Sequence, residues 1–192
     1  MDQQVIDAPE AIAEVVDAPT PAPEPKPIDN GDDLVIWLAG PADVDEVMNI
    51  AIMASEENGL VRAAPGRLLN DIWPALNLDH GMMGAIGKPG GRIEGVILLR
   101  IGALWYSEEN VLEEKAIFIH PDFRSAKGGR MRKFCDFAKA TSDRLGLPLV
   151  IGVLSDERTV AKVRTYQKVF GPPAGAFFVY RPKGGEPAEA GT

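Results

Sequence analysis

The chain has 192 residues, of which 45% are hydrophobic and 25% charged, values ordinary for a soluble globular protein with one domain and tails. The formal net charge of -8 lies at the two ends: residues 1–31 hold seven acids and one lysine, and residues 184–192 hold two acids. Residues 32–183 are therefore neutral, with 19 acidic and 19 basic side chains. A neutral domain lacks the basic face that sequence-independent DNA or RNA binding needs, so no nucleic-acid partner is expected.

The two ends differ in composition from the part between them. Residues 1–31 contain six prolines, five of them at alternate positions. Because proline has no amide hydrogen and a fixed φ, we expect an extended acidic arm there, which offers a docking segment for a protein partner. Residues 184–192 are rich in Gly, Pro, Ala and Glu, and we expect a disordered tail. A single domain over 32–183 remains.

The first half of this domain predicts a strand, two helices and a β-hairpin. The helices show apolar residues at helical spacing, and Pro74 is expected to interrupt the second one. The two hairpin strands are joined by a turn that contains glycine, so we expect them to be antiparallel neighbours. In chain order the expected elements are a strand at 34–38, helices at 44–59 and 68–76, and strands at 82–86 and 93–104.

The second half alternates strands and helices. Cys135, the only cysteine, lies on an apolar helix stripe and is expected in the core; one cysteine excludes an intrachain disulfide and favours a reducing, cytoplasmic setting. No signal-peptide pattern or apolar run of transmembrane length is present, so no membrane association is expected. The expected elements are a strand at 112–120, a helix at 129–145, a strand at 148–154, a helix at 159–169 and a strand at 176–181.

The strongest motif joins the strand at 112–120 to the helix that follows it. It reads Pro-Asp-Phe-Arg-Ser-Ala-Lys-Gly-Gly-Arg over residues 121–130. Diphosphate binding needs converging N–H donors, a positive helix end and glycines that let the backbone approach, and this segment supplies all three. Seven bases against two acids lie between Arg124 and Arg144. The motif predicts a diphosphate loop; the alternative is a basic, Gly-rich helix start on the surface.

The order of elements, together with this loop, resembles the GNAT acetyltransferase superfamily over roughly residues 33–182. The resemblance implies an α/β (α+β) GNAT fold, a mixed central sheet of about six or seven strands flanked by helices on both faces, and acetyl-coenzyme A as cofactor. The family loop reads Arg or Gln, two residues, Gly, one residue, then Gly or Ala, whereas Lys127 stands here at the first Gly position. The loop is thus divergent. The residues implied to contact coenzyme A are Ile117, Ile119, Arg124, Ser125, Ala126, Lys127, Gly128, Gly129 and Arg130.

The resemblance also implies residues for proton transfer, which acyl transfer to an amine requires. Counting back six residues from Ile119 gives Glu113 as the base; Glu114, expected on the opposite strand face, is the reserve. Tyr166 matches the family tyrosine that protonates the departing thiolate, although the Asn that accompanies it is missing here. The alternatives are two solvated glutamates at a strand end and a tyrosine that only packs, with its hydroxyl in solvent.

The resemblance places the acceptor between the early helices and the last strands. Trp73, Trp105 and Tyr106 are candidates for its rim, and ordinary core packing is the alternative. The two histidines lack the spacing of a metal motif, so no metal site is expected. The predicted function is direct transfer of an acetyl group from acetyl-coenzyme A to an amine, of a small molecule or a protein lysine, in a ternary complex. A non-catalytic GNAT-like module whose arm docks a partner is the alternative, and homodimer formation is left open.

Overall fold

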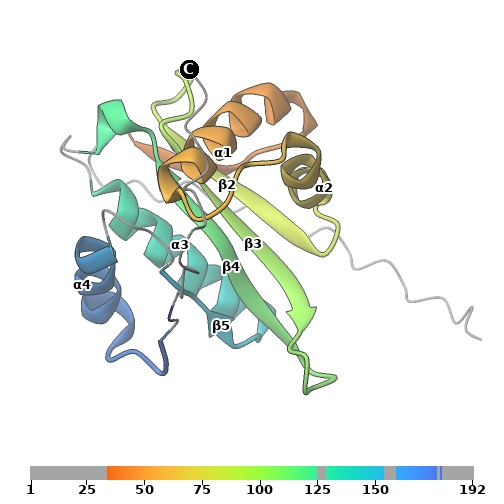
Figure 1. Ribbon diagram of the computed structural model, residues 1–192, viewed down its shortest axis with the longest axis vertical. Helices are drawn as coiled ribbons and strands as arrows, with labels where there is room; N and C mark the ends of the chain where they lie inside the picture. Colours follow the sequence, from red (N-terminus) through yellow and green to blue (C-terminus); the bar gives the residue numbers. More distant parts are fainter. Residues whose placement is uncertain (1–33, 125–128, 154–158, 177, 179–192) are drawn as a thin grey trace, which may run out of the picture.

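The computed structural model describes residues 34–124, 129–153, 159–176 and 178. The arm expected at 1–31 and the tail expected at 184–192 lie outside these residues. Figure 1 shows the described elements packed around one sheet. In chain order they are β1 (Val35–Leu38), the 3₁₀ helix η1 (Pro41–Asp43), α1 (Val44–Asn58), α2 (Pro65–Leu76), β2 (Gly81–Gly87), β3 (Gly95–Ala103), β4 (Asn110–Ile119), the 3₁₀ helix η2 (Pro121–Phe123), α3 (Arg130–Leu145), β5 (Leu149–Val150) and α4 (Thr159–Phe170).

The sheet is mixed, as expected. Its strands follow the order β1-β2-β3-β4-β5; the first three neighbouring pairs are antiparallel and β4 pairs with β5 in parallel. The hairpin of β2 and β3 is thereby confirmed. The described residues form five strands, fewer than the six or seven expected. The strand expected at 148–154 is only Leu149–Val150, and in the range 176–181 the described residues, Ala176 and Phe178, are not in a strand.

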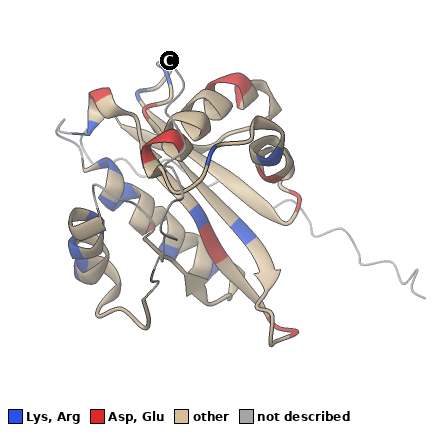
Figure 2. Cartoon of the chain, in the orientation of Figure 1, with Lys and Arg blue, Asp and Glu red and all other residues tan. Residues whose placement is uncertain are grey.

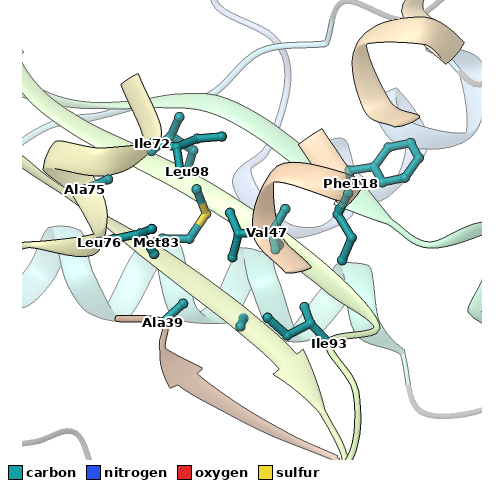
Figure 3. Close-up of a cluster of buried hydrophobic side chains, with 12 residues drawn as sticks. Ala39, Val47, Ile72, Ala75, Leu76, Met83, Ile93, Leu98 and Phe118 are labelled. Carbon is teal, nitrogen blue, oxygen red and sulfur yellow. The ribbon is translucent and has the colours of Figure 1, made fainter. Parts of the chain in front are cut away.

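Helices cover both faces of the sheet because both faces are apolar. In β3, Val96 and Leu98 pack in a cluster with residues of α1 and α2, whereas Ile97 and Leu99 pack in a second cluster with α3 and α4. This alternation buries the strand on both sides. Figure 3 shows part of the first cluster, where Met83 and Leu98 of the sheet lie near Val47 of α1 and Ile72 of α2. The expected helices on both faces are confirmed.

The break expected at Pro74 is wrong, because α2 runs from Pro65 to Leu76 with Pro74 inside it. Proline removes one intrahelical hydrogen bond, a loss that matters less near a helix end. Pro74 lies two residues before that end, and its carbonyl accepts hydrogen bonds from the N–H groups of Asn77 (3.0 Å) and Asp79 (2.9 Å). The helix therefore continues past Pro74, and the Pro74 carbonyl takes part in its C-terminal turn.

A β-bulge in β4 decides which side chains reach each face. Leu98 pairs with Ala116 and Leu99 with Glu114, so Lys115 is an extra residue without a partner on β3. One inserted residue reverses the alternation of every residue after it. Leu112 and Ile117, five residues apart, consequently pack in the same cluster with α3 and α4. Before the bulge, Glu114 lies on the face of Leu112 and Glu113 lies on the opposite face.

Candidate functional site

Strand β4 is paired with β5 only at its beginning. Leu112 pairs with Leu149 and Glu113 with Val150. Beyond these pairs, the N–H of Gly152 donates to the Oε2 atom of Glu114 (3.3 Å) instead of to the backbone of β4. From Glu114 to Ile119, β4 has no strand partner on this side among the described residues. A strand edge of this kind presents backbone N–H and C=O groups to a ligand.

Glu114 lies at the point where the two strands part. Its side chain is half-buried, and burial raises the pKa of its carboxyl group to about 7, although the Gly152 N–H and the Lys162 ammonium both act to lower it. Desolvation is the larger effect because it removes water from the charged form. A carboxyl group with a pKa near 7 exchanges a proton at neutral pH, which is the property required of a general base.

Tyr166, on α4, lies beside Glu114. It is 8% exposed and packs edge-on against Phe170, with 5.7 Å between ring centroids. Burial, and then the nearby Glu114 and Cys135, raise the pKa of its hydroxyl group. Burial likewise raises the pKa of the Cys135 thiol to about 12. The tyrosine and the cysteine are therefore both protonated at neutral pH, and Cys135 is a core residue, as expected.

Glu113 lies in a different setting from Glu114. Its carboxylate pairs with Lys115 Nζ at 2.7 Å, and its side chain is 40% exposed. Across the sheet its neighbour is Arg100, which pairs with Asp71 of α2 at 2.5 Å. In Figure 2, acidic and basic residues lie next to one another on the ribbons of the central strands. The expectation that the two glutamates face opposite ways is confirmed, and the charges on the Glu113 side are balanced in pairs.

The diphosphate loop is described only at its two ends. Ser125, Ala126, Lys127 and Gly128 lie outside the described residues. Gly129 is the N-cap of α3, with φ +59°, and no side chain of the described residues caps this helix end. The first helical hydrogen bond runs from the Lys133 N–H to the Gly129 carbonyl (3.0 Å). The N–H groups of the first turn have no acceptor inside a helix, and together with the helix dipole they favour an anion.

The two arginines at the loop ends hold protein carboxylates. Arg124 pairs with Glu57 of α1, and its Nε donates to the Ile119 carbonyl at 2.8 Å. Arg130 pairs with Glu94, and both side chains are buried. Farther along α3, Arg132 pairs with Asp136 at 3.3 Å. Much of the positive charge that the sequence places at this helix is therefore compensated inside the protein.

Sequence reasoning missed the carboxylates that bind these arginines, Glu57 and Glu94. Glu94 is the only acid in the apolar run 93–104, and that position was a usable signal of a buried ion pair. Glu57 is one of several acids in α1 and carried no such signal. Of the two isoleucines expected at the cofactor, Ile117 is buried and Ile119 is half-buried in the cluster with α3 and α4, so only their main chain faces the free edge of β4.

The three aromatic side chains considered for the acceptor rim are exposed. Trp73 is 48%, Trp105 95% and Tyr106 69% exposed, so core packing is wrong for all three. Trp105 and Tyr106 form an edge-on pair in the connection between β3 and β4, with centroids 5.5 Å apart. Within the described part of the chain, no group of three His, Cys, Asp or Glu side chains is placed to hold a metal ion. No described helix has the length and apolar character needed to cross a membrane.

Known structures share this architecture. A structure of AAC(6′)-Iy in complex with a bisubstrate analogue of CoA and monomethyl-acetylneamine superposes with a TM-score of 0.59 at 15% identity, covering 78% of this chain and 98% of the other. The aminoglycoside 6′-N-acetyltransferase AAC(6′)-Ih of Acinetobacter baumannii gives a TM-score of 0.57 at 8% identity, covering 78% and 97% of the two chains. A ribosomal-protein-alanine N-acetyltransferase of Brucella melitensis gives 0.54 at 12% identity, covering 76% and 98%.

Comparison by sequence gives no such match. No protein-family model and no curated protein matches the chain. At 8–15% identity, the structural likeness establishes the fold and leaves the reaction to be argued from the site. The mixed sheet, the short parallel pair of β4 and β5 and the helices on both faces, taken with these superpositions, show that the chain has the fold of the GNAT acetyltransferases.

Proposed function

We propose that the protein is an N-acetyltransferase that transfers the acetyl group of acetyl-coenzyme A directly to a primary amine in a ternary complex. The observation that carries the proposal is the free edge of β4, which leads through η2 and residues 124–129 to the N-terminal end of α3. A strand edge followed by a helix end suits a linear ligand with amide groups along its arm and a diphosphate at one end. The solved structure with the CoA analogue supports the same cofactor.

The residues available for coenzyme A fit this ligand. We assign its amide-containing arm to the main chain near Ile117 and Ile119, and its diphosphate to the N–H groups that begin α3 after Gly129. Among the described residues no side chain caps α3, and the positive end of its helix dipole favours the negatively charged diphosphate. Bound acetyl-coenzyme A supplies the acyl group as a thioester; the protein supplies orientation and proton transfer.

We assign proton removal from the amine to Glu114 in preference to Glu113. Glu114 has a carboxyl pKa of about 7 and lies beside Tyr166 at the parting of β4 and β5. Glu113 is held by Lys115 on the other face of the strand. As the amine nitrogen bonds to the acetyl carbon and the carbon–sulfur bond breaks, the amine proton passes to Glu114. Tyr166, which is protonated at neutral pH, donates its proton to the departing sulfur and is then reprotonated from Glu114.

The proposed acceptor is a primary amine, carried either by a small molecule or by a protein. One of the similar proteins is, by its name, an aminoglycoside 6′-N-acetyltransferase, and another was solved with an analogue that joins CoA to monomethyl-acetylneamine; both support a small-molecule amine. A third is named as a ribosomal-protein-alanine N-acetyltransferase. We place the reacting amine at the parting of β4 and β5, beside Glu114, because that carboxyl group receives its proton. Trp73 of α2 is exposed, and its helix lies over the opposite face, where Asp71 contacts Arg100.

The first test is calorimetry with coenzyme A and acetyl-coenzyme A. Failure to bind either at millimolar concentration would refute the proposal. Binding should then be compared between Gly129→Asp and Gly129→Asn, because both side chains tolerate the left-handed backbone of this residue and differ mainly in charge. We expect only the aspartate to weaken binding strongly, since its charge lies beside the diphosphate.

The second test is a thiol-release assay over a panel of amines, from aminoglycosides to lysine peptides. Turnover on any of them supports the enzyme. Binding of coenzyme A without turnover on the whole panel would favour the non-catalytic module instead. Deletion of residues 1–31 would then show whether that segment is needed to hold a protein partner.

A further inference from the structure

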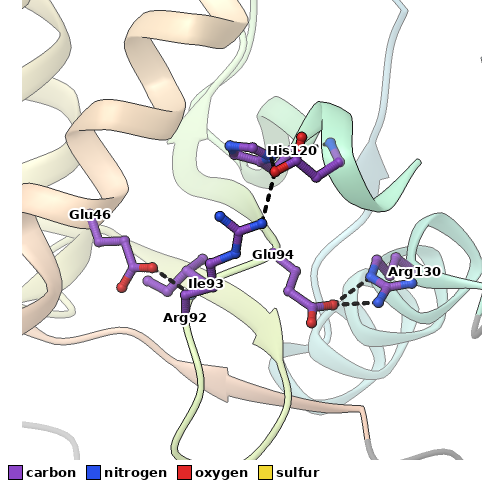
Figure 4. Close-up of polar contacts among 7 residues, drawn as sticks. Glu46, Arg92, Ile93, Glu94, His120 and Arg130 are labelled. Carbon is purple, nitrogen blue, oxygen red and sulfur yellow. Dashed lines mark hydrogen bonds and ion pairs between the residues drawn. The ribbon is translucent and has the colours of Figure 1, made fainter. Parts of the chain in front are cut away.

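The most deeply buried ion pair that the structure describes joins Glu94, just before β3, to Arg130, the first residue of α3. Their side chains are 6% and 7% exposed. Arg130 Nε lies 2.7 Å and Nη2 2.5 Å from the same carboxylate oxygen of Glu94 (Figure 4). The two residues are 36 positions apart, and the diphosphate loop lies between them in sequence. This pair therefore fixes the residue that ends the loop.

Glu94 is itself held rigidly. Its N–H donates to the Ile86 carbonyl at 2.7 Å, and its carbonyl accepts from the His120 N–H at 2.9 Å. The carboxylate that receives Arg130 is thus attached to backbone bonded on both sides, to the end of β2 and to the end of β4. A rigid carboxylate sets the position of the arginine rather than following it.

The neighbouring residues of the same short segment hold the other end of the loop. Arg92 pairs with Asp122 at 2.8 Å, and its guanidinium carbon lies 4.5 Å from the centre of the Phe123 ring. Arg130 lies 5.2 Å from the same ring. The N–H of Ile93 donates to Glu46 of α1 at 2.6 Å. Residues 92–94 thus connect η2, α1 and α3, as Figure 4 shows.

We propose that the Glu94–Arg130 pair is a positioning device for the diphosphate site. It fixes the N-terminal end of α3 so that its backbone N–H groups point at the diphosphate, and the Arg130 guanidinium does not itself bind phosphate. This inference rests on the proposed function. Arg130 acts through the helix that it holds, so it is a positioning residue. Glu94 is equally important for coenzyme A binding, although its negative charge lies near the site of an anion.

Removing the charge of Glu94 tests the proposal. Direct phosphate binding by Arg130 and positioning of the helix predict opposite changes in the affinity for coenzyme A. If Arg130 bound phosphate directly, Glu94→Gln would remove a competing negative charge and free the guanidinium, so coenzyme A would bind more tightly. If the pair positions the helix, the same change weakens binding. We expect Kd for coenzyme A to rise about tenfold, the size of losing one charged hydrogen bond to the ligand.

Three further variants complete the binding experiment. Glu94→Asp keeps the charge but shortens the side chain by one methylene. Arg130→Lys keeps the charge but cannot place two nitrogens on one oxygen. Each should weaken coenzyme A binding, as Glu94→Gln does. Arg132→Gln is the matched control, because it removes one positive charge from the same turn of α3 while its exposed partner is Asp136. It should change Kd far less. Thermal unfolding of each variant identifies any that fail to fold.

Hydrogen exchange in the ligand-free protein tests the inference separately from the proposed function. Glu94→Gln and Glu94→Asp should speed exchange at the Lys133 amide, which makes the first helical hydrogen bond, and leave amides near the C-terminal end of α3 unchanged. Faster exchange in a protein that does not bind coenzyme A would refute the function and retain the positioning role. Unchanged exchange, or tighter binding of coenzyme A by Glu94→Gln, would overturn the inference.

Discussion

Glu114→Gln should make the protein more stable at alkaline pH. In the folded chain the Glu114 carboxyl has a pKa of about 7, against 4.5 for an ordinary glutamate. Because the folded pKa is raised, the folded state retains a proton that the unfolded state has lost, and stability falls as pH rises between the two values. From pH 5 to pH 8.5 this single group costs about 2–3 kcal/mol. Glutamine has no charge to desolvate, and its carbonyl can still accept the Gly152 N–H.

The measurement is urea unfolding of the wild type and Glu114→Gln at pH 5, 7 and 8.5. The difference in unfolding free energy between the two proteins should be small at pH 5 and grow by about 2–3 kcal/mol in favour of glutamine by pH 8.5. Glu113→Gln is the matched control, because that carboxylate is 40% exposed and pairs with Lys115. A constant difference across this pH range for Glu114→Gln would mean that the carboxyl group is well solvated, and its assignment as general base would lose its basis.

Other predictions concern the rate and the packing. Tyr166→Phe should lower kcat by about 10²- to 10⁴-fold with little change in KM or in the thermal midpoint, and unchanged kcat would remove the hydroxyl from the mechanism. The kcat/KM of the wild type should fall as pH drops below about 7, where Glu114 becomes protonated, and a flat profile there would contradict its role. Gly84→Ala should cost about 1–3 kcal/mol, because its Cβ would lie 2.7 Å from Ile97 Cγ2, whereas Gly102→Ala, which has no atom within 4 Å, should change stability little; urea unfolding of both tests this.

Much of the fold follows from patterns that sequence reasoning can detect. The continuous apolar runs of β2 and β3, and the glycine that begins α3, are local signals, and the structure places all three elements where they were expected. The length of β5 is set differently. Residues 148–154 are apolar and predict a longer strand, but β5 pairs with β4 only as far as Val150, where the two strands part. No local sequence pattern indicates this point of separation. Element types are thus local properties, whereas the geometry that frees the edge of β4 is tertiary.

The choice between the two glutamates shows the same limit at the site. Counting back from Ile119 assumes that residues alternate without interruption along β4, and on that basis Glu113 shares a face with Ile117 and Ile119. The extra residue Lys115 reverses the alternation, so Glu114 is the residue that reaches Tyr166 and Gly152. A bulge has no reliable sequence signature, because it depends on how two strands pair rather than on the residue inserted. Deleting Lys115 removes the extra residue and still leaves Glu114 opposite Leu99 and Ala116 opposite Leu98. The deletion variant, like Lys115→Ala, should therefore keep Glu114 beside Tyr166 and retain the pH dependence of stability that Glu114 causes, measured by urea unfolding at pH 5 and pH 8.5. Loss of that pH dependence in the deletion variant alone would show that the bulge itself, and not the pairing of Glu114 with Leu99, places the carboxyl group beside Tyr166.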